Sequence, residues 1–227
     1  MKWGKRRDSA LLVTMLVAML LLAYLSTFVA VLPPLPWDAI SFHLFFYHIP
    51  IAWTAYLSFG VVFAASVQYL RTRAQKWDMV AASSAEVGVL MTTLALLSGS
   101  LWSKAQLGYY WTWEDAKLFT TFILWMAYVA YIALRTGVRG DARARLCAVF
   151  GIISFVFVPL SFFSSRWLVS VHTNLTSYPF PMINGVILLL GVVAFTIFYV
   201  ALFRLRYDLE TQMAEIETVK EAMEETT

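Results

Sequence analysis

Residues 183–203 read INGVILLLGVVAFTIFYVALF and carry no charged side chain. An α-helix of about 20 residues crosses the ~30 Å hydrocarbon core of a bilayer, and this stretch has the required length. Because the backbone must satisfy its own hydrogen bonds in lipid, a continuous apolar stretch of this kind is helical. The segment therefore predicts a membrane-spanning helix.

Other apolar stretches of similar length precede this one. They lie at about Ser9–Leu32, Leu44–Leu70, Val80–Leu101, Leu118–Leu134 and Leu146–Phe163. Polar and apolar residues do not alternate in the way that marks a transmembrane β-barrel. We therefore expect an all-α integral membrane protein with six transmembrane helices.

The composition points the same way. Of 227 residues, 60% are hydrophobic and 14% are charged, whereas a soluble domain is nearer half apolar and a quarter charged. This excludes an ordinary water-soluble fold and a disordered chain. The single cysteine, Cys147, excludes a disulfide framework and a Cys-only metal site. The net charge of +3 is too small to argue for a nucleic-acid partner.

The basic residues divide unevenly between the two sides of the membrane. Of the 17 Lys and Arg residues, 14 lie at the chain ends or in the second and fourth connections, which share one side. Lys104, Lys117 and Arg166 lie in connections on the other side. Because connections rich in Lys and Arg stay in the cytoplasm, we expect both termini to be cytoplasmic.

The chain is expected to form a six-helix membrane domain over residues 1–206 and an acidic cytoplasmic tail over residues 207–227. Apolar residues recur at helical spacing in the tail. They are Leu209, Met213, Ile216 and Met223. The tail is either a solvated extension of the sixth span or a helix that packs against a cytoplasmic partner.

The outer connections are rich in aromatic residues. Residues 102–117 read WSKAQLGYYWTWEDAK. Trp111 and Trp113 share a face if the chain is extended, and Gly108 permits close backbone approach. These residues predict either a flat aromatic platform for a ligand or an aromatic belt at the membrane interface.

Two histidines flank this loop in the sequence. His48 and His172 belong to separate outer regions and are expected to reach over the platform from opposite sides. Imidazole is a normal axial ligand of haem iron, and aromatic faces suit a flat macrocycle. Lys104, Lys117 and Arg166 are the outer cations for its propionates. His43 is expected to be only a polar group in wet surroundings.

The acidic residues near the loop and in the third span have structural interpretations. Thr112 and Asp115 fit a capping box that opens the fourth helix, where Glu114 and Asp115 also suit the helix dipole. Glu86 lies near the cytoplasmic end of the third span, where an unpaired charge is costly. We expect it to be neutral, paired or functional.

Motifs in the outer regions occur in a characteristic order. They are Tyr47-His48-Ile49-Pro50-x-x-Trp53, then Gly108-x-x-Trp111-x-Trp113 followed by Asp115-Ala116-Lys117-Leu118, then Trp167-x-x-x-x-His172. Together they resemble the CcmC-type haem-handling proteins of cytochrome c maturation, within the wider tryptophan-rich WWD-domain group. The resemblance covers about Phe42 to Ile183.

This resemblance implies an outer haem site in the prokaryotic plasma membrane. His48 and His172 would be the axial ligands, and haem b would be cargo carried by a protein that is not an enzyme. An outer-face haem chaperone would receive the haem, and an ATP-binding-cassette complex would release the loaded chaperone. The implied binding residues around the histidines are Gly108, Tyr110, Trp111, Trp113, Asp115, Lys117 and Arg166.

The sequence departs from the family pattern in the loop. Leu107 and Tyr110 stand where the family usually has Trp. Glu114 is an extra residue after Trp113, so either Glu114 or Asp115 is the counterpart of the family's Asp. The alternative function is a b-type haem electron-transfer or quinone-linked oxidoreductase subunit, whose histidines commonly lie inside facing spans.

The charge distribution makes the topology testable. A reporter that is active only in the cytoplasm, fused after Thr227, should be active because the basic connections lie on the same side as the C-terminus. Reporter activity normalised to fusion abundance is the measurement. A well-expressed but inactive fusion would refute this topology.

Overall fold

The computed structural model describes residues 2–32, 39–138, 140, 142–170, 172 and 180–224, and these residues form helices without a strand. The helices are α1 (Lys2–Phe28), α2 (Ala39–Thr72), α3 (Gln75–Leu107), α4 (Ala116–Gly137), α5 (Ala142–Ser154), α6 (Phe157–Trp167) and α7 (Met182–Glu224). They supply six segments long and apolar enough to cross a membrane. The predicted all-α membrane protein with six spans is confirmed.

The fifth span, Ala142–Trp167, consists of two helices rather than one. Pro159 causes the break because its nitrogen has no hydrogen to donate and its ring clashes with the carbonyl of Phe155. The chain tightens there instead, and the Phe155 N–H donates to the carbonyl of Ile152 at 3.3 Å. Pro159 then falls in the first turn of α6, where proline is tolerated.

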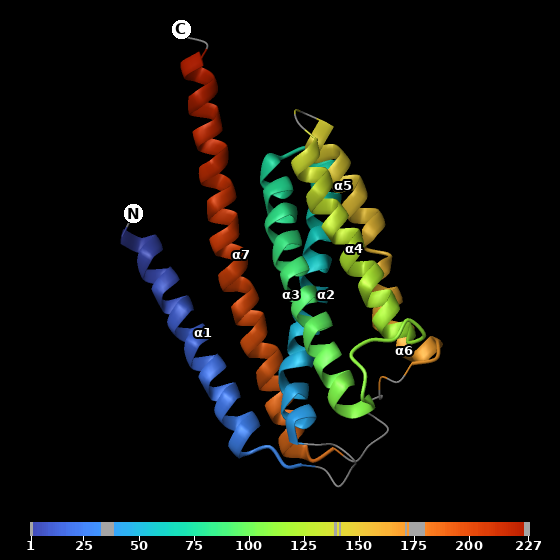
Figure 1. The fold of residues 1–227 in the computed structure, drawn as a ribbon. Helices are drawn as coiled ribbons and strands as arrows, with labels where there is room; N and C mark the ends of the chain where they lie inside the picture. The colour runs from blue at the N-terminus through green and yellow to red at the C-terminus, as the bar shows by residue number, and fades with distance from the viewer. Residues whose placement is uncertain are drawn as a thin grey trace.

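The helices pack on both sides of α2 and α3. Figure 1 shows α4, α5 and α6 on one side and α1 and α7 on the other. The largest core cluster joins α2 to α4 through Phe59 and Tyr128, whose rings stack with centroids 3.6 Å apart. α1 lies at the edge of the bundle against α7.

The start of α1 and the end of α7 lie toward the same end of the bundle, as an even number of spans requires (Figure 1). We call this the terminal end and the opposite end the site end. α7 continues as a helix beyond the other helices at the terminal end, and Leu209, Met213 and Ile216 are exposed there. Residues 225–227 of the predicted tail lie outside the described residues.

A network of ion pairs joins α3, α4 and α7 near the terminal end. Glu86 pairs with Arg206, which also binds Glu210. Arg135 donates to both carboxylate oxygens of buried Asp78 at 2.9 Å. Glu86 is therefore paired, which was one of its expected states and avoids the cost of an isolated charge at this depth.

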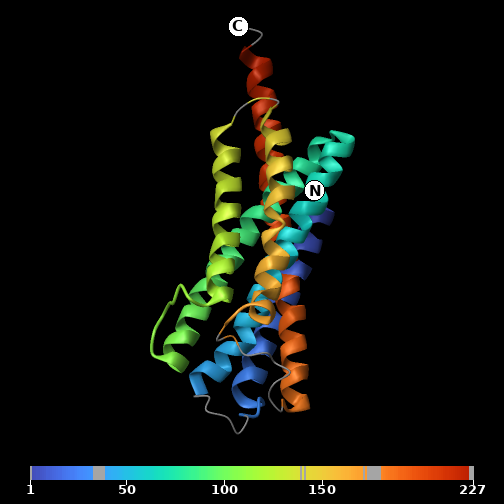
Figure 2. The ribbon, with the colours of Figure 1, turned by 90° about the vertical axis from the view of Figure 1, so that its right-hand side faces the viewer.

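The site end gathers the irregular segments of the chain. α3 continues to Leu107, so Trp102 belongs to this helix and not to the connection in which we expected it. The remaining loop of residues 108–115 stands out from the side of the bundle (Figure 2). Residues 33–38, the first of the aromatic connections, lie outside the described residues.

Candidate functional site

The fold brings His48 and His172 together. His48 lies in α2, and His172 lies in the connection between α6 and α7. Their ring centroids are 6.4 Å apart, with the ring planes inclined at 41°. Imidazole nitrogens ligate a metal at about 2 Å, so rings on opposite sides of one metal ion have centres roughly 6 Å apart. The pair therefore has a separation that suits two axial ligands of one iron.

Groups on α3 surround the His48 ring. Its Nδ1 lies 2.8 Å from the Oγ of Ser98. Gly99 leaves room for the ring, because a Cβ at this position would lie 3.2 Å from His48 Cε1. Further along α3, the ring of Trp102 lies 6.1 Å from that of His172. The end of α3 thus contacts both histidines.

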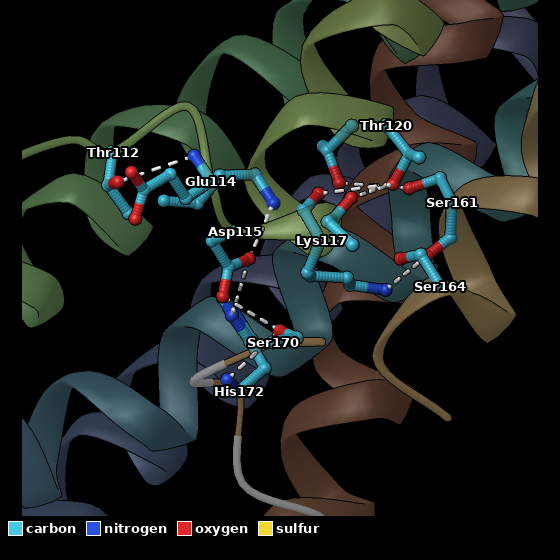
Figure 3. A network of polar contacts seen from close by, with 12 residues as sticks. Thr112, Glu114, Asp115, Lys117, Thr120, Ser161, Ser164, Ser170 and His172 are labelled. Carbon is cyan, nitrogen blue, oxygen red and sulfur yellow. Dashed lines mark hydrogen bonds and ion pairs between the residues drawn. The ribbon is translucent and has the colours of Figure 1, made fainter. Parts of the chain in front are cut away.

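Asp115 joins the start of α4 to the segment that carries His172 (Figure 3). It is the N-cap of α4, since its Oδ1 accepts from the Leu118 N–H at 2.9 Å. Its Oδ2 accepts from the Ser170 hydroxyl at 2.8 Å, and that hydroxyl accepts from the His172 N–H at 3.1 Å. The Ala116 N–H also donates to the Val169 carbonyl at 3.2 Å. The two connections are therefore fixed to each other.

The expected capping box from Thr112 is wrong. Thr112 lies outside the helix, where its hydroxyl accepts from the Glu114 N–H at 3.3 Å. Asp115 caps the helix instead and is 3% exposed, whereas Glu114 is exposed. Of the two carboxylates, Asp115 is the one that faces His172, with Oδ1 3.9 Å from Nδ1.

The surroundings of His172 favour the neutral form of its imidazole. Burial lowers its pKa to about 4, although the nearby Asp115 carboxylate acts in the opposite direction. The Nδ1 atom is buried and has no hydrogen-bond partner among the described residues. A neutral imidazole keeps the lone pair that a metal ligand requires.

Trp111 and Trp113 form an aromatic group with the first turns of α4. Their ring centroids are 5.3 Å apart with planes at 73°, and both rings pack edge-to-face against Phe122. This arrangement is favourable for aromatic quadrupoles, so the two rings do not share the single plane of the expected platform. Trp113 is 62% exposed, and no described residue forms a hydrogen bond with the buried indole N–H of Trp111.

The predicted cations have different surroundings. Lys117 extends toward α6, where its Nζ donates to the Ser161 carbonyl at 2.7 Å and to the Tyr56 hydroxyl at 3.1 Å (Figure 3). Lys104 donates to the Gly108 carbonyl at 2.7 Å and lies over the Tyr110 ring. Gly108 ends α3 with φ +84°, a conformation that favours glycine.

Arg166 lies in the last turn of α6, where it is exposed. His43 differs from the histidine pair in its hydrogen bond, because its Nδ1 donates to the Ser26 carbonyl at 2.8 Å. The structure therefore distinguishes His43 from the two histidines that face each other.

Sequence reasoning missed the groups that hold the histidines in place. Ser98 and Gly99 lie within an apolar span, and Ser170 lies in an unremarkable part of the last connection. Small polar residues in a span are a signal of close packing. That signal does not say which residue of another helix they face.

Comparison with known proteins gives several relatives. A protein named heme exporter protein C from Bradyrhizobium diazoefficiens is 36% identical over 130 residues, which cover 57% of this chain and 49% of that protein. A protein of the same name from Haemophilus influenzae is 28% identical over 178 residues, covering 75% of this chain and 71% of that protein.

A Marchantia polymorpha protein, named as a putative cytochrome c biosynthesis ccmC-like mitochondrial protein, is 26% identical over 132 residues. These residues cover 58% of this chain and 55% of that protein. The chain thus spans about half the length of this relative and of the Bradyrhizobium protein. The family model described as heme exporter protein C matches residues 3–223, and the chain therefore belongs to the CcmC family.

Proposed function

We propose that this protein binds haem as cargo at the site end and hands it on for cytochrome c maturation, with no bond chemistry of its own. The observation that carries this proposal is the facing pair of His48 and His172, whose ring centroids are 6.4 Å apart. Two imidazoles supply axial ligands, and haem b brings the equatorial nitrogens with it.

The surroundings of the pair support a flat apolar cargo. Trp102 lies beside His172, and the Trp111–Trp113 group lies on the adjoining start of α4. The buried indole N–H of Trp111 has no partner among the residues that the structure describes, so we expect it to be available to an acceptor such as a propionate. The guanidinium of Arg166 is exposed and could reach the other propionate.

The same arrangement supports transfer from the outer face of a prokaryotic plasma membrane. Exposed aromatic side chains at the site end, Tyr110, Trp113 and Trp167, offer an apolar surface to an outer haem chaperone. We assign residues 1–206 to the membrane domain and 207–227 to a cytoplasmic tail. The tail carries exposed apolar residues on the side where an ATP-binding-cassette complex would expose its nucleotide-binding subunits.

His48→Ala and His172→Ala should each lose most of the haem bound to the purified protein, because each removes one axial ligand. His43→Ala should retain it, since the His43 ring bonds the Ser26 carbonyl instead. Haem per protein, measured after equal membrane insertion, is the readout. Full haem occupancy in both single variants would rule out the axial-ligand assignment.

Replacing both Trp111 and Trp113 by Ala should reduce haem retention and cytochrome c yield more than it reduces membrane insertion. Aromatic pairs contribute roughly 0.5–1.5 kcal/mol beyond their buried area, so one lost ring should weaken retention about tenfold at most. Tyr24→Ala, which removes an exposed ring from α1, away from the site residues, is the matched control. Wild-type haem content and yield in the inserted double variant would leave the two tryptophans as an interfacial belt.

A further inference from the structure

The direction of the hydrogen bond between His48 and Ser98 depends on which acceptor receives the one proton of the Ser98 hydroxyl. The Leu94 carbonyl lies 2.7 Å from this hydroxyl and the Ala95 carbonyl lies 3.2 Å from it, and a carbonyl can only accept. When the hydroxyl donates to either carbonyl, the proton between Ser98 and His48 comes from the ring. In this arrangement His48 Nδ1 is protonated and donates to Ser98 Oγ at 2.8 Å. Its Nε2 then carries the free lone pair.

Gly99 fixes how closely the His48 ring approaches α3. A Cβ on this residue would lie 3.2 Å from Cε1 and 4.0 Å from Nε2 of His48. The ring thus lies against the backbone of α3, with Ser98 at one nitrogen. The helix holds both the position and the tautomer of the imidazole.

His172 faces a different kind of group. Within the part of the chain that the structure describes, its buried Nδ1 has no hydrogen-bond partner, and it lies 3.9 Å from Asp115 Oδ1. The carboxylate is held in place by the Leu118 N–H and by the Ser170 hydroxyl. A protonated Nδ1 moving about 1 Å closer would donate to this oxygen at ordinary hydrogen-bond length.

A carboxylate polarises an imidazole more strongly than a hydroxyl does. A metal-ligating histidine commonly donates its other N–H to a carboxylate or carbonyl, which fixes the tautomer and raises the basicity of the ligating nitrogen. Asp115 would raise the basicity of His172 Nε2, whereas Ser98 leaves His48 close to an ordinary neutral imidazole. The two nitrogens offered to iron are therefore unequal.

We propose that Ser98 and Asp115 are positioning residues that hold the Nδ1 protons of His48 and His172, and that they make His172 the stronger and His48 the weaker axial ligand. This inference rests on the proposed binding of haem. On this proposal, the bond between iron and His48, the imidazole held by the neutral hydroxyl of Ser98, breaks first when haem is released.

The first test uses protein without haem. The sequence contains three histidines, so selective ¹⁵N labelling of histidine resolves each ring by NMR, with His43 as an internal Nδ1-protonated reference. We expect His48 to be a single Nδ1-protonated tautomer that becomes a mixture in Ser98→Ala. Ser103→Ala is the matched control, because the hydroxyl of this buried serine of α3 forms no hydrogen bond with any described residue. An Nε2-protonated His48, or no change in Ser98→Ala, would overturn the assignment.

The second test uses haem-loaded protein. Asp115→Asn should weaken haem binding about 10- to 100-fold and raise the reduction potential of the bound haem. Ser98→Ala should weaken binding about tenfold or less with a smaller shift in potential. Asn is also a good N-cap, so α4 is preserved, and an unchanged melting temperature of the haem-free variant checks this. Ser170→Ala, which releases both Asp115 Oδ2 and the His172 N–H, should weaken haem binding.

Glu114→Gln is the control for Asp115→Asn, since it removes one charge from the same loop at an exposed position. Equal reduction potentials of the bound haem in Glu114→Gln and Asp115→Asn would contradict the proposal that the two axial ligands differ in strength. An equal shift of this potential in Ser98→Ala and Asp115→Asn would contradict it as well. Wild-type protein that binds no haem, together with the expected NMR result, would reject the proposed function and leave the His48 assignment intact.

Discussion

Within lipid, every backbone N–H and C=O must find its partner inside the protein, and this requirement shapes the whole chain. It forces long helices through the bilayer and places the longer irregular segments at the two ends of the bundle, whereas the break inside the fifth span is short. The loop of residues 108–115 and the segment that carries His172 both lie at the site end. A binding site made of side chains from separate helices and connections can therefore form there without exposing unpaired backbone groups to hydrocarbon.

Asp115 connects two of these segments to each other. One oxygen caps α4 and the other binds Ser170, so the carboxylate that begins a helix also positions the chain around His172. On the facing side, α3 positions His48 through Ser98 and Gly99. The two imidazoles thus meet because α3 holds the His48 ring, while the cap of α4 holds the backbone of His172 through Ser170.

The sequence predicted the spans well because hydropathy alone decides whether a helix can cross a membrane. It also contained the cause of the break in the fifth span, Pro159, although an uninterrupted apolar stretch concealed it. The end of α3 was placed too early because Trp102–Leu107 is polar enough to read as a connection. The cap of α4 was misassigned because both Thr112 and Asp115 fit local capping rules, and only the packing of the loop distinguishes them.

The histidine pair was predicted from motif order. The groups that support it could not be, because they depend on how α2 and α3 are rotated about their axes, and residue spacing along one chain does not give that rotation.

The most direct test of the account is the absorption and electron paramagnetic resonance spectrum of the purified wild-type protein with haem, oxidised and reduced. Ligation by His48 and His172 predicts a six-coordinate, low-spin haem with two imidazole ligands in the oxidised state. A high-spin haem, or a thiolate or methionine ligand, would contradict it.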